Sequence, residues 1–278
     1  GKSTMARLLI HLIEPDTGEV ILDGYKIGAR DGILVREMRS QVQMVFQDSY
    51  ASLNPRMPIE ESIAFGPMAD GVPNKEAMER SIDLMSKVGL EPSMFLHRYP
   101  HELSGGQRQR VNIARALAMQ PRVLLLDEAV SALDKSVEAQ VLNLLADLQV
   151  ELGLTYLFIS HDLAVVRQLA DSVAVMFAGR IVEQGAAADV YGAARHPYTR
   201  ALLAAIPGTD PLDREPGDDV EVKEARIDIA EDGCSFRLRC PIAQDVCAEQ
   251  SPPFARIDGT AHDVACHFGD VPVTVGAS

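Results

Sequence analysis

The sequence predicts an α/β fold: a parallel sheet core with an inserted helical subdomain and a small Cys-rich C-terminal extension. Two apolar runs of strand length, Val123–Leu126 and Leu154–Ser160, predict the sheet, because continuous apolar runs are typical of strands buried on both faces. The first run leads to Asp127 and Glu128, and the second leads to His161. Open α/β sheets place their ligands at the carboxyl ends of the strands, so these three side chains mark the expected site.

The first residues carry the third observation, because Gly1-Lys2-Ser3-Thr4 matches the last part of the phosphate-loop pattern G-x-x-x-x-G-K-[ST]. In such a loop the lysine reaches the β- and γ-phosphates of a nucleotide, and the following hydroxyl binds Mg²⁺. An apolar helix over Met5–Ile13 is expected next. The first glycine of the pattern, the strand before it and an initiating Met are absent. We therefore expect a fragment or a truncated chain that binds ATP poorly without upstream residues.

Length and composition suit one large α/β domain, or one domain with an appendage, because 47% of the 278 residues are hydrophobic. No apolar run approaches the ~18 residues of a membrane span. The formal net charge of −14, from 26 basic and 40 acidic residues, argues against broad binding to nucleic acid or to anionic membranes.

The segment before the acidic pair alternates strands with helices. Glu19–Asp23 and Val42–Phe46 are expected strands, and the second ends on Gln47. A glutamine at a strand end beside a phosphate site can bind Mg²⁺ or the attacking water, whereas its ordinary interpretation is a solvated loop amide. Helical patterns at Glu60–Phe65 and Lys75–Val88 predict the inserted subdomain, at about residues 55–120.

A further helix is expected over Gln107–Met119, directly after Ser104, Gly105 and Gly106. Such a helix start offers free backbone N–H groups and the positive end of the helix dipole to an anion. After the acidic pair we expect one more amphipathic helix, a two-stranded hairpin and two short helices. Their expected ranges are Ser136–Glu151, Ser172–Phe177 with Gly179–Gln184, Ala186–Gly192 and Tyr198–Ile206.

Six motifs over residues 1–185 resemble, in their order, those of the ATPase subunit of an ATP-binding-cassette (ABC) transporter. They are the phosphate loop at Lys2, the glutamine loop at Gln47, the signature Leu103–Gln107, the carboxylates Asp127 and Glu128, the D-loop at Asp134 and the switch histidine His161. The segments 46–55, 98–102 and 196–200 resemble the dipeptide/oligopeptide importer branch of this family. The chain departs from the family pattern at Ala129, where Pro is usual, and at Lys135 after the D-loop. Neither departure removes a catalytic group.

The resemblance implies a P-loop NTPase core and a separate role for each of these residues. Glu128 is expected to be the general base, with His161 and Gln47 holding the γ-phosphate and the attacking water. The other implied sets are ATP binding by Gly1, Lys2, Ser3 and Thr4, and Mg²⁺ binding by Ser3, Gln47 and Asp127. Ser104, Gly105, Gly106 and Gln107 are expected to close the ATP site of a partner chain, and Asp134 to join that dimer contact.

The resemblance also implies partners and a location. A second ATPase chain would pair head-to-tail with this one, as a homodimer or a heterodimer. Two transmembrane permease subunits would dock on the pair, and an extracellular solute-binding protein would act indirectly. The expected location is the cytoplasmic face of the cell membrane. The expected function is ATP-driven import of di- or oligopeptides, or of similar small solutes, with no nucleic-acid partner.

Two other classes of function stay open. One is an ATPase of the same superfamily without a membrane partner, of the translation or DNA-repair type. The acidic balance, the importer-like segments and the C-terminal cysteines argue against it. The other is a catalytically silent regulatory subunit. The presence of Glu128 and His161 argues against that, whereas the incomplete phosphate loop favours it for this chain.

The last third of the chain differs in composition. Residues 208–233 carry ten acidic and three basic side chains, as expected of a solvated linker between a nucleotide-binding domain at 1–207 and an extension at 234–278. The extension holds all four cysteines of the chain, Cys234, Cys240, Cys247 and Cys266. Four thiolates suit an iron–sulfur cluster or tetrahedral Zn²⁺, and unligated cysteines also fit. In the importer branch this extension is associated with a [4Fe-4S] cluster in some members. His262 and His267 are possible substitute ligands, although we expect them as surface or supporting groups.

Overall fold

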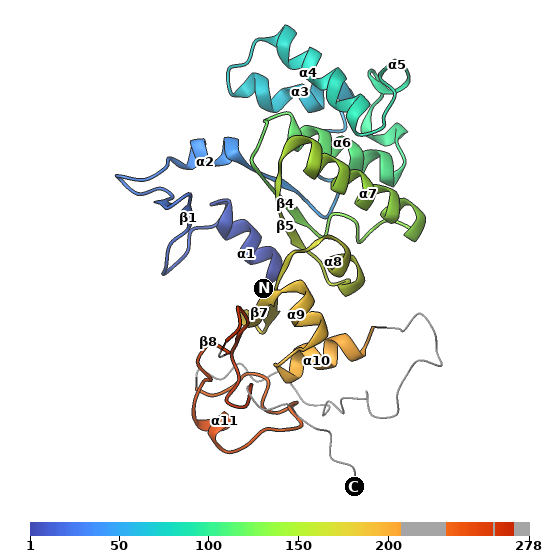
Figure 1. Cartoon of the computed structure of the whole chain (residues 1–278). Helices are drawn as coiled ribbons and strands as arrows, with labels where there is room; N and C mark the ends of the chain where they lie inside the picture. Colours follow the sequence, from blue (N-terminus) through green and yellow to red (C-terminus); the bar gives the residue numbers. More distant parts are fainter. Residues whose placement is uncertain (207–231, 258, 270–278) are drawn as a thin grey trace. The chain divides into compact units, whose positions relative to one another are not determined.

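A computed structural model describes residues 1–206, 232–257 and 259–269 of the chain (Figure 1). The chain folds as two compact units. The first unit is Ser3–His161, and the second consists of Asp162 onward together with Gly1–Lys2. The acidic linker predicted at 208–233 lies outside the described residues except for its last two positions, and residues 270–278 of the predicted extension also lie outside them. The domain limits 1–207 and 234–278 stay predictions.

The first unit is organised around a parallel sheet in the order β3 (Val42–Val45), β4 (Val123–Asp127) and β5 (Thr155–Ile159). The central strand pairs Leu126 with Val45 on one side and with Phe158 on the other. Because β4 has a neighbour on each side and helices over its faces, its residues Leu124, Leu125 and Leu126 are buried. This burial explains the continuous apolar run in the sequence. All three strands point their carboxyl ends to the same edge.

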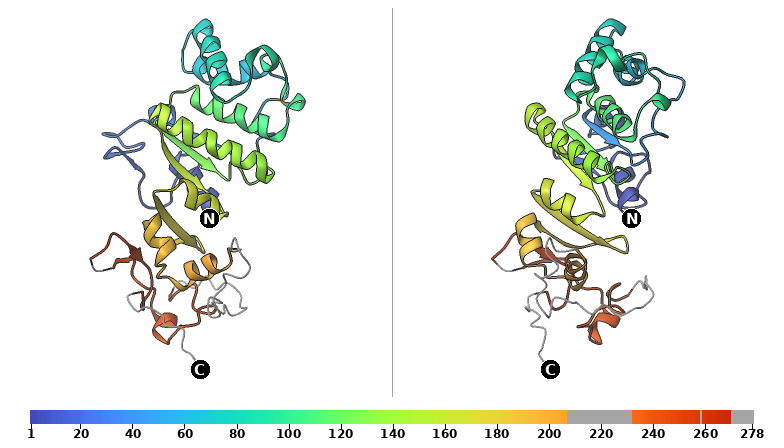
Figure 2. Two further views of the ribbon diagram at one scale, coloured as in Figure 1. Left: turned by 45° about the vertical axis from the view of Figure 1, so that its right-hand side comes forward. Right: turned by 90° about the vertical axis from the view of Figure 1, so that its right-hand side faces the viewer.

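Helices cover the sheet and form the inserted subdomain. Leu125 of β4 packs with Ala6 and Ile10 from the segment of α1 (Lys2–Leu9) and the turn after it. Helices α3 (Ile59–Ala69), α4 (Asn74–Lys87) and α6 (Gly105–Leu117) contact one another (Figure 2). The unit also contains β1 (Ile21–Leu22), β2 (Tyr25–Lys26), α2 (Val35–Gln41), α5 (Pro92–Phe95), η1 (Pro100–Glu102) and α7 (Lys135–Leu152).

The second unit is built on an antiparallel sheet in the order β6 (Ser172–Phe177), β7 (Arg180–Ala186), β9 (Asp263–Val264) and β8 (Ala255–Arg256). The predicted hairpin is confirmed: Ala178 (φ +46°) and Gly179 (φ +84°) form its two-residue turn, as the primed turns of hairpins require. The remaining elements are α8 (Leu163–Leu169), α9 (Ala187–Gly192), α10 (Pro197–Ala204) and α11 (Val246–Glu249).

Several element limits differ from those expected. The first helix begins at Lys2 and ends at Leu9, whereas the apolar pattern predicted Met5–Ile13. Helix α6 begins at Gly105, two residues before the predicted start, because Ser104 caps it. The first turn of such a helix is polar and carries no apolar periodicity, so the sequence pattern predicts a helix start that lies too far along the chain. The short strands β8 and β9 were not predicted, because two-residue strands leave no sequence pattern.

Candidate functional site

The carboxyl ends of the three parallel strands bring the predicted catalytic residues together. The segment after β3 supplies Gln47, β4 supplies Asp127 and then Glu128, and the segment after β5 supplies His161. Gln47 Nε2 donates to Glu128 Oε2 at 2.8 Å. His161 Nδ1 lies 3.3 Å from Glu128 Oε1. The two oxygens of the Glu128 carboxylate therefore face one side chain from each neighbouring strand end.

Glu128 has an unusual backbone conformation, because its φ of +49° lies in the left-handed region that non-glycine residues rarely adopt. Its N–H donates to the Ile159 carbonyl at 2.9 Å, and its own carbonyl accepts from the Ser131 N–H and hydroxyl. These bonds end β4 sharply after Asp127. No local sequence pattern indicates this turn.

Asp127 lies beside the hydroxyl of the phosphate-loop serine. Ser3 Oγ donates to Asp127 Oδ1 at 3.2 Å, and the Asp127 side chain is buried. A carboxylate and a hydroxyl are oxygen ligands, which Mg²⁺ prefers, so the donor set fits the predicted magnesium ion. Lys2 is the first residue of α1, Gly1 precedes it, and Thr4 lies in the same first turn.

The signature residues form the start of α6. Ser104 Oγ accepts from the Gln107 N–H at 3.3 Å, and Gln107 Oε1 accepts from the Ser104 N–H at 2.9 Å. The N–H groups of the intervening Gly105 and Gly106 take no part in this reciprocal capping box. Asp134 caps α7, accepting from the Val137 N–H at 2.9 Å and from the Ser136 hydroxyl at 2.7 Å. These two bonds lower the pKa of the Asp134 carboxyl, which keeps it ionised.

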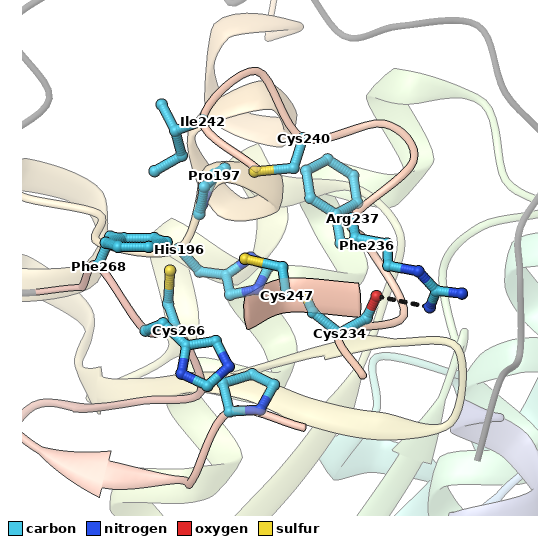
Figure 3. A pocket seen from close by; sticks show the side chains of 12 residues that line it. His196, Pro197, Cys234, Phe236, Arg237, Cys240, Ile242, Cys247, Cys266 and Phe268 are labelled. Carbon is cyan, nitrogen blue, oxygen red and sulfur yellow. Dashed lines mark hydrogen bonds between the residues drawn. The ribbon is translucent and has the colours of Figure 1, made fainter. Parts of the chain in front are cut away.

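The four cysteines of the second unit line one pocket, together with His196, Phe236 and His267 (Figure 3). All four are free thiols. Burial raises the pKa of Cys240 to about 11 and raises the pKa values of Cys234 and Cys266. Among the described residues, no group of three or more His, Cys, Asp or Glu side chains is arranged to hold a metal ion.

Sequence reasoning missed a buried network next to this pocket. Glu183 of β7 is fully buried, and its carboxylate accepts from His262 Nε2 at 2.7 Å and from the His196 N–H at 3.0 Å. The expectation of a surface His262 is wrong in part, because its side chain is 3% exposed. The sequence held one signal for this network. Glu183 stands at an inward position of an apolar strand, and a buried carboxylate needs a partner.

Comparison with known proteins matches these features to two family models. Residues 1–131 match the family described as "ABC transporter", and residues 182–247 match "Oligopeptide/dipeptide transporter, C-terminal region". The oligopeptide transport ATP-binding protein OppF of Haemophilus influenzae is 45% identical over 273 residues, which cover 96% of this chain and 81% of OppF. This chain belongs to the ATP-binding proteins of ABC transporters.

Further comparisons agree. The oligopeptide transport ATP-binding protein AppF of Bacillus subtilis is 44% identical over 280 residues, covering 96% of this chain and 82% of AppF. Among solved structures, cbiO1 of Clostridium perfringens, part of the ABC transporter complex cbiONQ, aligns with a TM-score of 0.62. The alignment has 30% identity and covers 73% of this chain and 79% of cbiO1. The predicted P-loop NTPase fold is confirmed, and as an ABC ATP-binding protein this chain is an ATPase.

Within the part of the chain that the structure describes, no helix is both long enough and apolar enough to cross a membrane.

Proposed function

We propose that this ABC ATP-binding protein hydrolyses ATP to power the import of peptides. The observation that carries the proposal is the convergence of Gln47 and His161 on the two carboxylate oxygens of Glu128. The relatives named for oligopeptide transport, aligned over 96% of this chain, support peptides as the cargo. The match of residues 182–247 to the oligopeptide/dipeptide transporter region supports the same cargo class.

In the proposed mechanism, Glu128 accepts a proton from the water that attacks the γ-phosphate. Gln47 and His161 hold this carboxylate at the strand ends, so its oxygens are aimed before substrate binds. Ser3 and Asp127, 3.2 Å apart, would hold Mg²⁺, which neutralises phosphate charge when bound. The other proposed ATP contacts come from Gly1, Lys2 and Thr4.

We assign the signature residues Ser104–Gln107 to the ATP of a partner chain, with Asp134 in the same contact. The glycine N–H groups at the start of α6 suit a phosphate, because a helix N-terminus favours negative charge. This assignment requires a head-to-tail ATPase dimer. The proposed complex adds two permease subunits at the cytoplasmic face of the membrane, and an extracellular solute-binding protein acts through them.

Peptide uptake tests the proposed cargo. Cells that lack this gene are supplied with the wild-type chain or with Glu128→Gln, and the uptake of labelled di- and oligopeptides is compared with that of a non-peptide solute. The proposal predicts peptide uptake with the wild-type chain alone. Restored uptake of only the non-peptide solute would contradict peptide import. Copurification of the chain with nucleic acid, without any permease, would favour the translation or DNA-repair class.

The cysteine pocket supports a second proposal, a [4Fe-4S] cluster bound by Cys234, Cys240, Cys247 and Cys266. A tetrahedral Zn²⁺ site needs its sulfurs about 3.8 Å apart, given Zn–S bonds of about 2.3 Å. The four thiols line one pocket, and four thiolates are also the ligand set of a [4Fe-4S] cluster. When bound, the cluster supplies positive iron that stabilises thiolates. An iron–sulfur absorption band that vanishes when the cysteines are replaced tests the cluster, and bound zinc without that band contradicts it.

A further inference from the structure

Three polar side chains form a stripe along helix α6. Arg108, Asn112 and Arg115 are spaced i, i+4 and i+7, so they lie on one face of the helix, and we call them the polar stripe. Residues between them, such as Ile113 and Ala114, are fully buried, and Asn112 itself is 1% exposed. A polar side chain at such depth needs a partner within the protein, because solvent cannot supply one.

The polar stripe finds its partners in one short segment, residues 48–53, which we call the 48–53 turn. Asn112 Nδ2 donates to the Ser49 carbonyl at 2.9 Å. The Arg115 guanidinium donates to the Ser52 carbonyl. Two carbonyls of the turn are therefore bound by donors from the same face of α6.

Arg108 adds a third contact with this turn. Its guanidinium carbon lies 5.5 Å from the centre of the Tyr50 ring, within the range of a cation–π contact. The same guanidinium donates to the Leu103 carbonyl, which fixes its position at the start of α6. Helix α6 thus holds the 48–53 turn at three of its positions.

The 48–53 turn is closed by its own first residue. The Asp48 carboxylate accepts the N–H groups of Tyr50 and Ala51, each at 2.9 Å. The Asp48 carbonyl accepts the hydroxyl of Ser52 at 2.6 Å and its N–H at 3.2 Å. Because these bonds make the turn one closed unit, the contacts with α6 fix its first residue as well as the residues that they touch.

Gln47 lies directly before this turn, and directly after the last residues of the β3 segment. Its side chain is exposed, and it donates to Glu128 Oε2 at 2.8 Å. An exposed side chain has little packing to hold it, so its position depends on the backbone at both sides. The sheet holds one side through β3, and α6 holds the other through the 48–53 turn.

We propose that the polar stripe of α6 positions Gln47 for its contact with Glu128 through the 48–53 turn. This inference rests on the proposed function, in which Glu128 is the general base. The stripe residues contact the turn and not the reacting atoms, so they are positioning residues. Loss of this positioning should lower kcat and leave the affinity for ATP unchanged, because other residues bind ATP.

Arg115→Met removes the donor to the Ser52 carbonyl and keeps most of the side-chain volume. We expect kcat for ATP in the assembled transporter to fall about 10-fold, with an unchanged Kd for ATP. Arg115→Lys keeps a donor and should recover most of the turnover. Arg110→Met is the matched control, because Arg110 lies on the same helix and donates to the Val88 carbonyl, outside the 48–53 turn. Its turnover should stay near the wild-type value.

A double-mutant cycle separates the positioning of Gln47 from a merely structural role. If Arg115 acts through Gln47, Arg115→Met should change turnover by less than about two-fold in the Gln47→Ala background. An equal loss in both backgrounds would overturn the proposal, and so would full turnover of Arg115→Met. If Arg115→Met does not fold, Asn112→Ala, a smaller change that removes the donor to Ser49, takes its place in the cycle under the same criteria.

Hydrogen exchange tests the contact without using catalysis, so it distinguishes failure of this inference from failure of the proposed function. In the full chain, the two amides that bond to the Asp48 carboxylate should exchange faster in Arg115→Met than in the wild type or Arg110→Met. Unchanged exchange would overturn the inference even with Glu128 as the base. Faster exchange, together with wild-type turnover in Glu128→Gln, would refute the proposed function and thereby remove the basis of the inference.

Discussion

At the scale of single residues, the backbone of Glu128 is the most informative feature. A left-handed conformation costs a non-glycine residue about 1–3 kcal/mol, and it persists only where surrounding bonds enforce it. Here the Ile159 carbonyl and Ser131 enforce it, and the result is a carboxylate directed at Gln47 and His161. The strain is therefore linked to the position of the proposed catalytic base.

Gln47→Ala should lower ATP turnover by about 10- to 100-fold. A hydrogen bond to a charged group contributes about 1.5–3 kcal/mol, and its loss leaves the Glu128 carboxylate less well oriented. Gln47 is exposed, so the fold should not change. The measurement is kcat for ATP in the assembled transporter.

Gln43→Ala is the matched control, because Gln43 lies on β3, the strand that leads to Gln47, and bonds to the Arg39 carbonyl instead. Its turnover should stay near the wild-type value. Equal losses in both variants would show that the strand, and not the contact with Glu128, determines the rate.

At the scale of elements, Gly106 in the first turn of α6 lies against α7 with no room for a side chain. A Cβ at Gly106 would overlap Val137 Cγ1, whereas a Cβ at Gly105 would lie 3.8 Å from Leu133, an ordinary contact. The two signature glycines thus have different structural requirements. Gly106 is needed for helix packing, besides any contact with phosphate.

Gly106→Ala should destabilise the chain by about 1–3 kcal/mol, because overpacking displaces α6 from α7. Gly105→Ala is the control and should stay within about 1 kcal/mol of the wild type. Val137→Ala in the Gly106→Ala background should recover part of the loss. Chemical unfolding measures all of these variants, and identical free energies for the two alanine variants would refute the packing argument.

The contact between β5 and α7 gives a pH dependence. Tyr156 donates to the Leu145 carbonyl at 2.8 Å, and burial raises the pKa of its phenol above 10. The folded state thus favours the neutral phenol. Its contribution to stability is complete below pH 10, and it is lost above pH 10 as the phenol of the unfolded chain ionises.

Above pH 10, the wild-type chain should therefore lose more stability than Tyr156→Phe, which has no phenol to titrate at this position. Unfolding free energies measured below and above pH 10 give the two slopes. Tyr191 and Tyr198 also have raised pKa values, but they contribute equally to both proteins. Parallel slopes would contradict the prediction.

The first unit was more predictable than the second for a physical reason. Leu124, Leu125 and Leu126 are buried, and the apolar composition of 123–126 and 154–160 indicates strands and places Asp127, Glu128 and His161 at one edge. The second segment keeps this composition although its strand β5 is only partly buried. The left-handed turn at Glu128 has no such signal, because a hydrogen bond to the distant Ile159 stabilises it. Sequence patterns report local periodicity and not long-range pairing.

At the scale of the whole molecule, the fold of the second unit depends on strand pairing between segments that are distant in sequence. Strand β7 pairs with β9 through Glu183 and Val264, about eighty residues apart. The buried carboxylate of Glu183 then contacts His262 and the backbone of His196. The importer-like segment at 196–200 and the cysteine extension thus form one structure, which their separation in the sequence concealed.

The central claim is that this ABC ATP-binding protein hydrolyses ATP with Glu128 as the general base. The most direct test is steady-state ATP hydrolysis by the assembled transporter, with the wild-type chain or Glu128→Gln, alongside ATP binding. General-base catalysis contributes about 10²- to 10⁴-fold, so the variant should bind ATP normally and lose turnover by at least about 100-fold. Hydrolysis by the variant within a few-fold of the wild type would contradict the account and favour a regulatory subunit.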